Sequence, residues 1–280
     1  MKRRKRALGK LYVVGTPIGN LSDLSPRAVQ TLCECDFIAA EDTRVTLKIL
    51  NHFEIKKPMV SYFEHNKIER GDMIVERILS GEDCAIVTDA GMPAISDPGE
   101  DLVKQCHEAG IQVVSVPGPC AFSTALAISG METGRFCFEG FLSMNKNSRT
   151  EHLESLKDER RTMIFYEAPH KLSATLIDMY NTFGDREISI VRELTKIHEE
   201  VIKTSLESAK EKYQTEGIKG EIVLIVAGAK EEKNEFTLED AIKIAKEQMS
   251  DGMSLNESAK FAAKETGIKK NLIYKELTEN

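Results

Sequence analysis

The sequence predicts an α/β fold with two domains and a small helical module at the C-terminus. Its length of 280 residues suits one large or two modest domains. Short apolar runs alternate with amphipathic helical segments, and a polar stretch separates the last forty or so residues. With 41% hydrophobic residues, the chain can bury a core without a disulfide or a structural metal ion.

The first domain is expected at residues 11–130. Its apolar runs predict strands at residues 11–14, 36–40, 84–88 and 111–116, and the first of these is expected to be buried on both faces. The segments between them have helical patterns, at residues 27–34, 43–53, 67–79 and 99–109. Ser25 and Pro26 supply an N-cap and a first-turn proline for the first helix. Strands separated by helices predict right-handed crossovers and a mainly parallel sheet.

A second domain is expected at residues 131–230, after an interruption of the pattern at residues 128–136. Strands are predicted at residues 136–141, 162–166, 187–191, 200–204 and 221–227. Helices are predicted at residues 149–158, 170–182 and 205–214. The third and fourth of these strands are too close in sequence for a crossover helix, so this sheet should mix parallel and antiparallel pairs.

The C-terminal module is expected at residues 236–280, after a polar linker at residues 230–236. Helical patterns fall at about residues 237–249, 254–264 and 268–278. Ser254 should cap the second helix, and Thr266-Gly267 should form the turn before the third. This helix–turn–helix spacing occurs in nucleic-acid-binding modules and in simple packing units, so both interpretations stay open.

The charge is unevenly distributed along the chain. Residues 1–10 contain six basic residues and no acidic one, which predicts a basic leader. Residues 11–280 then carry 32 basic and 45 acidic residues, a net charge of −13. A body this acidic excludes binding of nucleic acid by bulk attraction, although a local basic patch is compatible with it.

The same sequence argues against secretion, membrane insertion and metal binding. The charged N-terminus is followed by no apolar segment, and no run approaches the ~18 apolar residues of a membrane span. The six cysteines lie in apolar settings without paired CxxC spacing, which is typical of free thiols in the cytoplasm. The six histidines show no ligand spacing, so no metal site is predicted.

Three loops rich in glycine and proline follow predicted strands, at residues 15–20, 89–99 and 117–121. In a parallel sheet such loops meet at the carboxyl edge, which favours a ligand cleft there. The first loop is not GxGxxG, and the chain has no Walker-type phosphate loop. The carboxylates of Asp89 and Asp97 suit a ligand with hydroxyls, an amine or a positive centre better than a polyphosphate.

Two further polar segments allow two interpretations each. The run Glu41-Asp42-Thr43-Arg44 could form an N-cap with an ion pair, or it could contact substrate. In Glu64-His65-Asn66, Asn66 could cap a helix or His65 could contact substrate. Nucleophilic catalysis has little support, because no GxSxG occurs and Cys120 has no assignable histidine partner.

Eight motifs, in the same order from residue 11 to the C-terminus, carry a family resemblance: LYVVGTPIGNLSDLSPRAVQTL, AAEDTR, TDAGMPAISDPG, VPGPCAFSTAL, FEGFL, YEAPHKL, RELTKIHEE and KGEIVLIVAG. Together they resemble the ribosomal RNA small subunit methyltransferase I family of tetrapyrrole-methylase-like (class III) enzymes. The resemblance implies a homodimer that binds S-adenosylmethionine in a cleft between two α/β domains. It implies methylation of a cytidine ribose 2′-hydroxyl in small-subunit (16S) rRNA, as free rRNA or in the assembled small ribosomal subunit.

The resemblance also implies roles for individual residues. Those implied for cofactor binding are Pro17, Asp89, Ala90, Gly91, Ile95, Ser96, Asp97, Ser123, Tyr166, Glu167, Ala168 and Leu194. A ribose hydroxyl is a poor nucleophile, so a base should help to remove its proton; the candidates are Asp42, Glu64 and His65, with Asp97 as a further one if it does not hold the cofactor. The candidates for phosphate contacts are Arg44, Lys146, Arg149 and Lys171.

The sequence departs from the family pattern at a few positions. Met92 and Cys120 stand where the family often has threonine and serine, and FLSMNKNSR has fewer basic residues than usual after Phe-Leu. Lys171 replaces the commoner arginine and so lacks a bidentate fork for phosphate. Two other functions stay open: a small-molecule methyltransferase of the same superfamily that acts on a porphyrin-like ring, and a non-enzymatic RNA-binding assembly factor.

Overall fold

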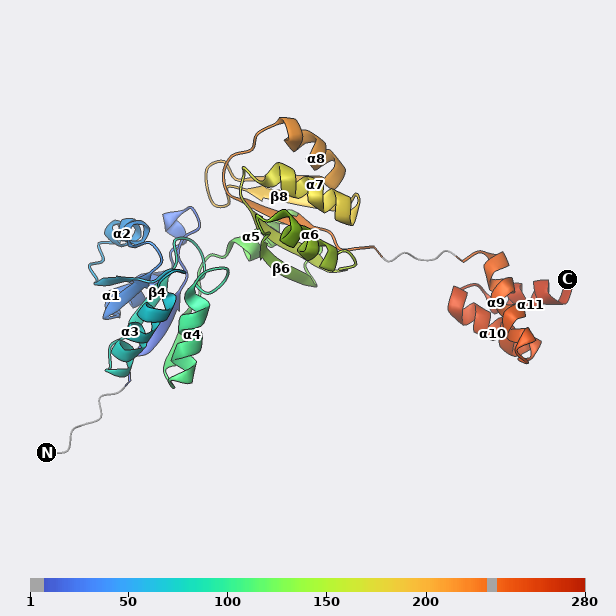
Figure 1. Ribbon diagram of the computed structural model, residues 1–280, viewed down its shortest axis with the longest axis horizontal. Coiled ribbons are helices and arrows are strands. Elements are labelled where there is room, and N and C mark those ends of the chain that lie inside the picture. The colour runs from blue at the N-terminus through green and yellow to red at the C-terminus, as the bar shows by residue number, and fades with distance from the viewer. Residues whose placement is uncertain (1–7, 231–235, 280) are drawn as a thin grey trace. The chain divides into compact units, whose positions relative to one another are not determined.

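A computed structural model describes residues 8–230 and 236–279 of the chain. The chain divides into two compact units, Met1–Ala229 and Lys230–Asn280. The first unit contains two α/β lobes, each built on a five-stranded sheet (Figure 1). Most of the expected basic leader, residues 1–7, lies outside the described residues.

The sheet of the first lobe is entirely parallel, with the strand order β3-β2-β4-β1-β5. Its strands are β1 (Lys10–Val14), β2 (Phe37–Ala40), β3 (Met59–Ser61), β4 (Cys84–Val87) and β5 (Gln112–Val116). The predicted parallel sheet is therefore confirmed. The strand β3 was not predicted from the sequence, because this edge strand has only three residues and pairs only with β2.

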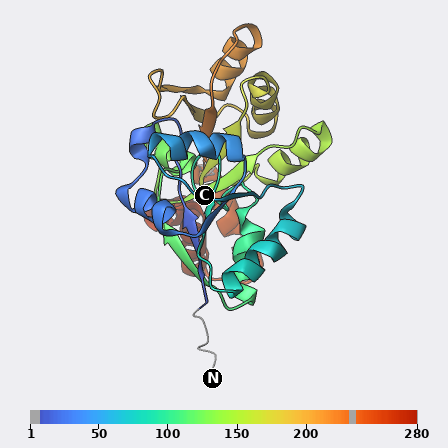
Figure 2. The same ribbon diagram turned by 90° about the vertical axis from the view of Figure 1, so that its left-hand side faces the viewer.

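Four helices and a 3₁₀ turn connect these strands: η1 (Leu21–Asp23), α1 (Pro26–Glu34), α2 (Thr43–His52), α3 (Lys67–Leu79) and α4 (Gly99–Glu108). The Ser25 hydroxyl accepts the N–H of Ala28 at 3.1 Å, which confirms the predicted N-cap of α1. Helices α1 and α2 bury Leu32 and Leu50 against one face of the sheet. Helices α3 and α4 bury Ile78 and Leu102 against the other face (Figure 2).

The sheet of the second lobe is mixed, as predicted. Its strand order is β6-β7-β10-β8-β9; only the β6–β7 pair is parallel. The strands are β6 (Phe136–Phe141), β7 (Thr162–Glu167), β8 (Glu187–Arg192), β9 (Glu200–Ser205) and β10 (Ile222–Val226). One face is covered by α6 (Lys146–Ser155), α7 (Leu172–Phe183) and α8 (Leu206–Thr215).

The other face of this sheet is covered by α5 (Ala121–Ser129), which contacts β7, β8, β9 and β10. Ala125 and Leu126 of this helix are buried against the sheet. The structure thus differs from the expected boundary near residue 130, which would assign α5 to the first domain. The interruption that suggested a boundary has a local cause: Gly130 ends α5 as its C-cap, with a φ of 68°.

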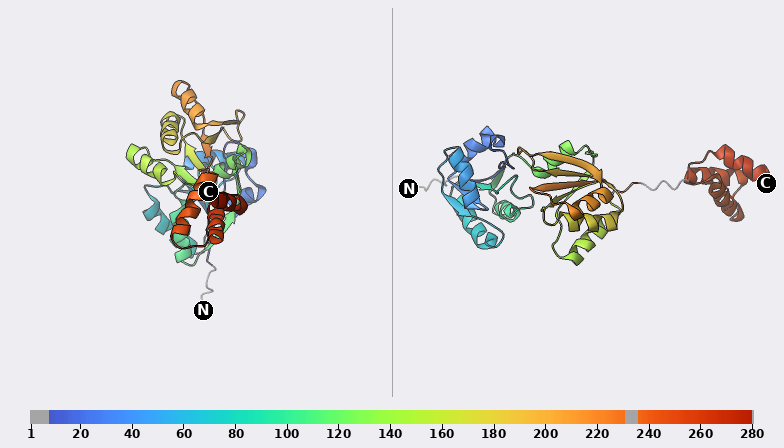
Figure 3. Two further views of the ribbon diagram at one scale, coloured as in Figure 1. Left: turned by 90° about the vertical axis from the view of Figure 1, so that its right-hand side faces the viewer. Right: turned by 90° about the horizontal axis from the view of Figure 1, so that it is seen from above.

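The second unit consists of α9 (Leu238–Ser250), α10 (Leu255–Thr266) and α11 (Lys270–Glu279), drawn in red in Figure 3. Thr237 and Ser254 form capping boxes at the starts of α9 and α10. The core of the unit is small and rich in alanine; it contains Ala241, Ala245, Ala259, Ala262 and Ile273. None of the helices in the described ranges is long and apolar enough to cross a membrane.

The three glycine- and proline-rich loops of the first lobe meet, as the sequence predicted. A Cβ on Gly15 would lie 2.7 Å from the backbone N and Cα of Gly118, so the first and third loops touch backbone to backbone. The second loop joins them through a bridge between Thr16 and Gly91. Only glycine allows so close an approach at residues 15 and 118.

Gly118→Ala tests this contact. Its Cβ would lie 2.8 Å from the carbonyl oxygen of Gly15, and neither backbone can move without moving its strand. We expect the free energy of unfolding to fall by ~1–3 kcal/mol, as in overpacked cores, in a urea titration. Gly134→Ala is the matched control, because its Cβ would meet nothing within 4 Å. Equal stability of the two variants would contradict the contact.

Candidate functional site

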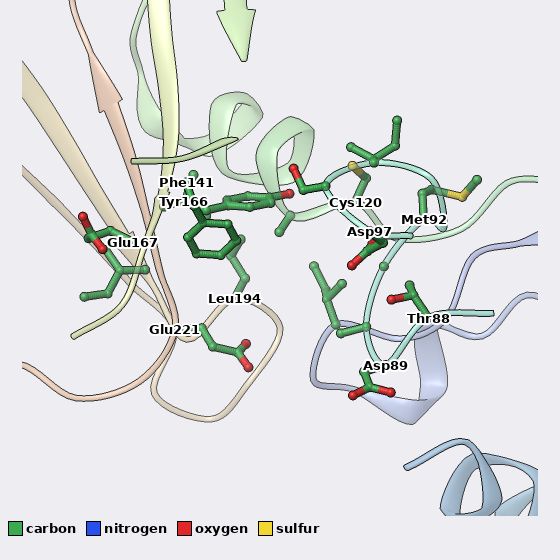
Figure 4. A pocket seen from close by; sticks show the side chains of 18 of the residues that line it. Thr88, Asp89, Met92, Asp97, Cys120, Phe141, Tyr166, Glu167, Leu194 and Glu221 are labelled. Atoms are coloured by element: carbon green, nitrogen blue, oxygen red, sulfur yellow. The ribbon is translucent and has the colours of Figure 1, made fainter. Parts of the chain in front are cut away.

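A cavity of about 420 Å³ lies between the loops of the first lobe and the carboxyl end of β7 in the second lobe. In Figure 4, Thr88, Asp97 and Cys120 lie on one side of it, and Phe141, Tyr166 and Leu194 face them from the other. Ten of the residues implied for cofactor binding line this cavity: Asp89, Ala90, Gly91, Ile95, Ser96, Asp97, Tyr166, Glu167, Ala168 and Leu194. The structure therefore brings together segments that are up to 105 residues apart in the chain, from Asp89 to Leu194.

The loop after β4 is held by backbone contacts with the loop after β1. The Thr16 N–H donates to the Gly91 carbonyl at 2.9 Å, and the Gly91 N–H donates to the Thr16 carbonyl at 3.2 Å. The hydroxyl of Thr16, which is buried, donates to the Thr88 carbonyl at 3.0 Å. In the same loop Ala94 and Ser96 adopt left-handed conformations, with φ values of 67° and 64°. Such strain in residues with a Cβ is concentrated at ligand-binding sites.

One wall of the cavity is acidic and consists of Glu41, Asp89 and Asp97. Glu41 Oε2 accepts the Thr88 hydroxyl at 2.5 Å and the Asp89 N–H at 3.3 Å. Asp89 Oδ1 accepts the N–H of Asp42 at 3.1 Å. Hydrogen bonds from groups at the strand ends therefore orient two of the three carboxylates, those of Glu41 and Asp89.

Two of these carboxylates have raised pKa values. Burial raises the pKa of Asp97 to about 7, and the negative charge of Glu41 adds to this effect. Burial also raises the pKa of Asp89, again with a contribution from Glu41. This wall is suited to a positively charged ligand. Within residues 8–230 and 236–279, no group of three or more His, Cys, Asp or Glu side chains is placed to hold a metal ion.

The opposite wall is aromatic and apolar. The rings of Phe141 and Tyr166 have centroids 5.3 Å apart. The Tyr166 hydroxyl accepts the N–H of Phe122 at 3.1 Å, in the first turn of α5, and burial raises the pKa of Tyr166 to about 12. Leu194 is buried between Glu193 and Thr195, which both have left-handed φ values, 53° and 66°. The wall can therefore pack on a flat or apolar group while the tyrosine stays protonated.

Some of the implied cofactor residues have other contacts. Pro17 and Ser123 are not among the lining residues, although Ile18, next to Pro17, is. The Ser123 hydroxyl donates to the Cys120 carbonyl at 3.1 Å. Glu167 lines the cavity, but its carboxylate accepts the Ala168 N–H at 2.8 Å and the Thr175 hydroxyl. Its side chain therefore holds the end of β7 in place.

The structure places none of the three candidate bases, Asp42, Glu64 and His65, in the cavity wall. Asp42 caps α2 and pairs with Arg44, whose guanidinium lowers the pKa of Asp42 to about 2. Such a carboxylate is a weak base. Glu64 pairs with Lys67 at 2.7 Å, and its side chain is 64% exposed. The lining residue is Glu41, one position before Asp42, because it directly follows the end of β2.

The four candidate phosphate contacts differ in their surroundings. The Arg44 side chain is 88% exposed, Lys146 is exposed at the start of α6, and Lys171 is half-buried before α7. For Arg149 the structure differs from the expected phosphate contact. Its Nη2 lies 2.7 Å from Asp178 Oδ2, with both side chains largely buried, and its Nη1 donates to the Ser143 carbonyl. Arg149 therefore anchors the 143–149 segment to α7 and is not free to grip a phosphate.

Eleven lining residues were not among those named for cofactor binding: Ile18, Glu41, Thr88, Met92, Cys120, Ala121, Phe141, Pro169, Glu221, Ile222 and Val223. Ile18, Met92, Cys120 and Ala121 lie in the three loops expected at the cleft, and Glu41 lies in a segment that was expected to cap a helix or to contact substrate. A usable signal existed for Glu41 and Thr88, because each directly follows a strand of the parallel sheet, where side chains reach the carboxyl edge. Glu221, Ile222 and Val223 gave no such signal, because they lie at the amino end of β10 and reach the cavity through antiparallel pairing with β7.

Comparisons with known proteins agree with this architecture. Residues 10–210 match the family model of tetrapyrrole (corrin/porphyrin) methylases. Curated relatives described as ribosomal RNA small subunit methyltransferase I include one from Synechocystis sp., 44% identical over 95% of this chain and 96% of the relative. Another, from Bacillus subtilis, is 43% identical over 98% of this chain and 94% of the relative.

Solved structures share the fold at low sequence identity. Diphthine synthase matches with a TM-score of 0.59 at 13% identity, over 78% of this chain and 90% of the other. A uroporphyrin-III C-methyltransferase from Thermus thermophilus, complexed with S-adenosyl homocysteine, matches with a TM-score of 0.56 at 16% identity. That match covers 78% of this chain and 97% of the other.

The raised pKa of Asp97 gives a pH-dependent stability. Between pH ~4 and ~7 the folded state retains a proton that an unfolded aspartate has lost, so stability should fall as pH rises through this window. From pH 4 to pH 8, the free energy of unfolding of Asp97→Asn should rise by ~1–2 kcal/mol relative to that of the wild type. This figure is reduced for solvent screening. Urea titrations at both pH values measure this difference.

Asp42→Asn serves as the control for this experiment. The pKa of Asp42 is held at about 2, so its titration falls below the window and its effect on stability should be the same at pH 4 and pH 8. A wild type and an Asp97→Asn variant with parallel pH profiles would show that Asp97 is ionised normally in the cavity.

Proposed function

The chain belongs to the tetrapyrrole methylase family and, within it, to the ribosomal RNA small subunit methyltransferase I family, and from this membership we propose its reaction. The protein transfers a methyl group from S-adenosylmethionine to the ribose 2′-hydroxyl of a cytidine in small-subunit rRNA. The observation that carries this proposal is the near full-length similarity to relatives of that name, combined with a cavity whose acidic wall suits a cationic methyl donor.

The alternative substrate, a porphyrin-like ring, is less well supported. The identity to the tetrapyrrole enzymes is 16%, whereas it is 41–47% to the rRNA methyltransferases. A 47% identical relative from Thermotoga maritima is matched over 99% of its length by 79% of this chain, a share close to that of the first unit. This match supports a methyl-transfer site complete in the first unit, with a separate role for the helical unit.

The residues of the cavity fit S-adenosylmethionine. Its sulfonium and ammonium groups are positive, and the acidic wall has two carboxylates, Asp89 and Asp97, whose pKa values are raised by burial and by the charge of Glu41. Its adenine is flat, and Ile18, Ile95 and Leu194 offer apolar contacts. Asp89 and Glu41 would hold the positive groups, and the loop backbone near Gly91 would approach the ligand closely. When bound, the cofactor supplies an electrophilic methyl group.

The chain's own contribution to the reaction is alignment and proton acceptance. Holding the hydroxyl in line with the methyl group can lower the barrier by up to ~7–11 kcal/mol. Asp97 is the carboxylate best suited to accept the hydroxyl proton, because its pKa of about 7 matches a neutral operating pH, whereas that of Asp42 is about 2. The half-buried ring of Tyr166 and the apolar lining restrict water around these groups.

Substrate RNA would contact the protein at a few exposed cations outside the cavity. The Arg44 guanidinium is held next to the cavity, since its partner Asp42 donates its backbone N–H to Asp89. Arg44 uses Nε and Nη2 for Asp42, and Nη1 has no hydrogen-bond partner in the part of the chain that the structure describes. Lys146 and Lys171 are further candidates. Few cations on an acidic body favour recognition by shape over bulk attraction.

The family also suggests a homodimer that works in the cytoplasm, where small subunits are assembled. Support for a dimer comes from α5, whose sequence AFSTALAIS has no charged residue although Ile128 is 40% exposed. An uncharged and mostly apolar helix is normally buried over most of its surface. A second copy of the chain would complete that burial.

Mapping of ribose methylation tests the function. Small subunits that lack the modification, incubated with the protein and S-adenosylmethionine, should gain one 2′-O-methylcytidine. Asp97→Asn should lower kcat by roughly 10²–10⁴-fold, the usual contribution of a general base. Methylation of a porphyrinogen but not of rRNA would overturn the proposal that rRNA is the substrate. A failure of the wild type to bind S-adenosylmethionine in calorimetry would instead favour the assembly-factor role.

Arg44→Ala tests the RNA contact. We expect a KM for the subunit that is raised several-fold, with the slope of log affinity against log salt reduced by about 1, because one phosphate contact is lost. Arg161→Ala is a matched control, because Arg161 forms a similar pair with Glu159 but precedes β7, at the far end of the strand from the cavity. If both variants behave alike, Arg44 has no special role.

A further inference from the structure

The edge strand β6 contains an irregularity that decides where one aromatic side chain points. Phe138 pairs with Ile164 of β7, but the next pairs are Gly140 with Phe165 and Phe141 with Tyr166. One residue, Glu139, is therefore extra, and the strand has a β-bulge. Gly140 adopts a φ of 66°, which glycine tolerates and other residues rarely adopt.

The bulge moves Phe141 from one face of the sheet to the other. Without it, alternation would place Phe141 on the face opposite to Phe138, the face covered by α6 and α7. With it, Phe141 lies across from Tyr166, on the face that Phe138 shares with α5 and the cavity. Side chains re-aimed by bulges are frequent next to active sites.

Phe141 is supported from behind and open in front. Tyr166 packs against Phe138 at 4.9 Å between ring centroids, and Phe138 stacks on Phe122 at 4.7 Å, so three further rings form a rigid base. Phe141 joins this base through Tyr166 and lines the cavity, yet it remains 58% exposed (Figure 4). Gly140 lies next to Ser96 of the opposite lobe, which places the ring at the boundary between the lobes.

We propose that Phe141 is a positioning residue that stacks on a nucleobase of the substrate RNA, an inference that rests on the proposed function. An exposed ring on a rigid aromatic base is the usual platform for an unpaired base, because every base has a π-face. Stacking would hold the nucleotide at the cavity rim while its ribose enters.

A flat base could also come from the cofactor, whose adenine has the same chemistry. The exposure of Phe141 favours the RNA, because a ring that is 58% exposed at the rim can meet a ligand arriving from solvent. The interior contacts for an adenine come instead from buried groups such as Ile18 and Leu194. The two sources are separated by measuring cofactor affinity and RNA kinetics on the same variants.

The experiment compares Phe141→Ala, Phe141→Leu and Phe141→Tyr with the wild type on small subunits. Loss of the ring should lower kcat/KM by roughly 5- to 150-fold, the equivalent of the ~1–3 kcal/mol of one base–aromatic stack. The loss should fall mainly on KM. Phe141→Leu, which retains apolar volume without a ring, should behave like Phe141→Ala, and Phe141→Tyr should restore wild-type values. Calorimetry should give the same S-adenosylmethionine affinity for all four proteins.

Two further variants separate stacking from general effects. Gly140→Ala meets no atom closer than 3.6 Å but disfavours the left-handed bulge, so it should reproduce part of the rise in KM. Met144→Ala removes another apolar side chain near the same strand end, 76% exposed and not lining the cavity. Met144→Ala should leave kcat/KM within about twofold of the wild type, since a thioether offers no stacking face.

The possible results separate the stacking role of Phe141 from the proposed function. Methylation by the wild type together with unchanged kinetics for Phe141→Ala would overturn the stacking role alone. If a Phe141 variant loses cofactor affinity together with activity, the ring stacks on the adenine of the cofactor. This result would also overturn the stacking on RNA. A wild type that methylates no rRNA contradicts the proposed function itself, which is a separate outcome.

Discussion

The backbone contact between Gly15 and Gly118 is the constraint on which the site depends. These residues lie just after the neighbouring parallel strands β1 and β5, and their close approach brings the loops that follow these strands into contact. The loop after β4 then joins through the Thr16–Gly91 bridge. Backbone groups thus form the floor of the site, which leaves side chains such as Asp89 and Asp97 free to face a ligand. A rigid floor of this kind reduces the ordering cost of binding.

The electrostatics of the cavity explain how an acidic protein can modify RNA. The acidic wall repels phosphate but attracts a sulfonium, so the methyl donor and the RNA backbone are drawn to different surfaces. Cations such as Arg44 stand outside the wall, where solvent leaves them available. Recognition through few charges and one aromatic platform would make binding depend on the shape of the assembled substrate.

Much of the architecture was predictable because it follows from local patterns. Four of the five strands of the first lobe were located from short apolar runs. The central strands β2 and β4 are buried throughout and have the continuous hydrophobicity of such strands, whereas β5 is an edge strand with exposed residues. The strand β3 was missed because a three-residue edge strand has too few residues for a pattern. The interruption near residue 130 is the C-cap of α5 at Gly130, and this helix packs on the second sheet, which no local pattern predicts.

The sequence by itself determined the two α/β lobes, the helical tail, the three loops and the family, since each depends on residues close together in the chain. Only the tertiary structure decided that Glu41 rather than Asp42 faces the cavity, that Arg149 is bound to Asp178, and that Phe141 reaches the rim. The physical reason is that long-range packing, which no local pattern encodes, sets the direction and the partners of a side chain. For Glu41 and Phe141 a shift of one residue reverses that direction, and for Arg149 the partner lies on another helix.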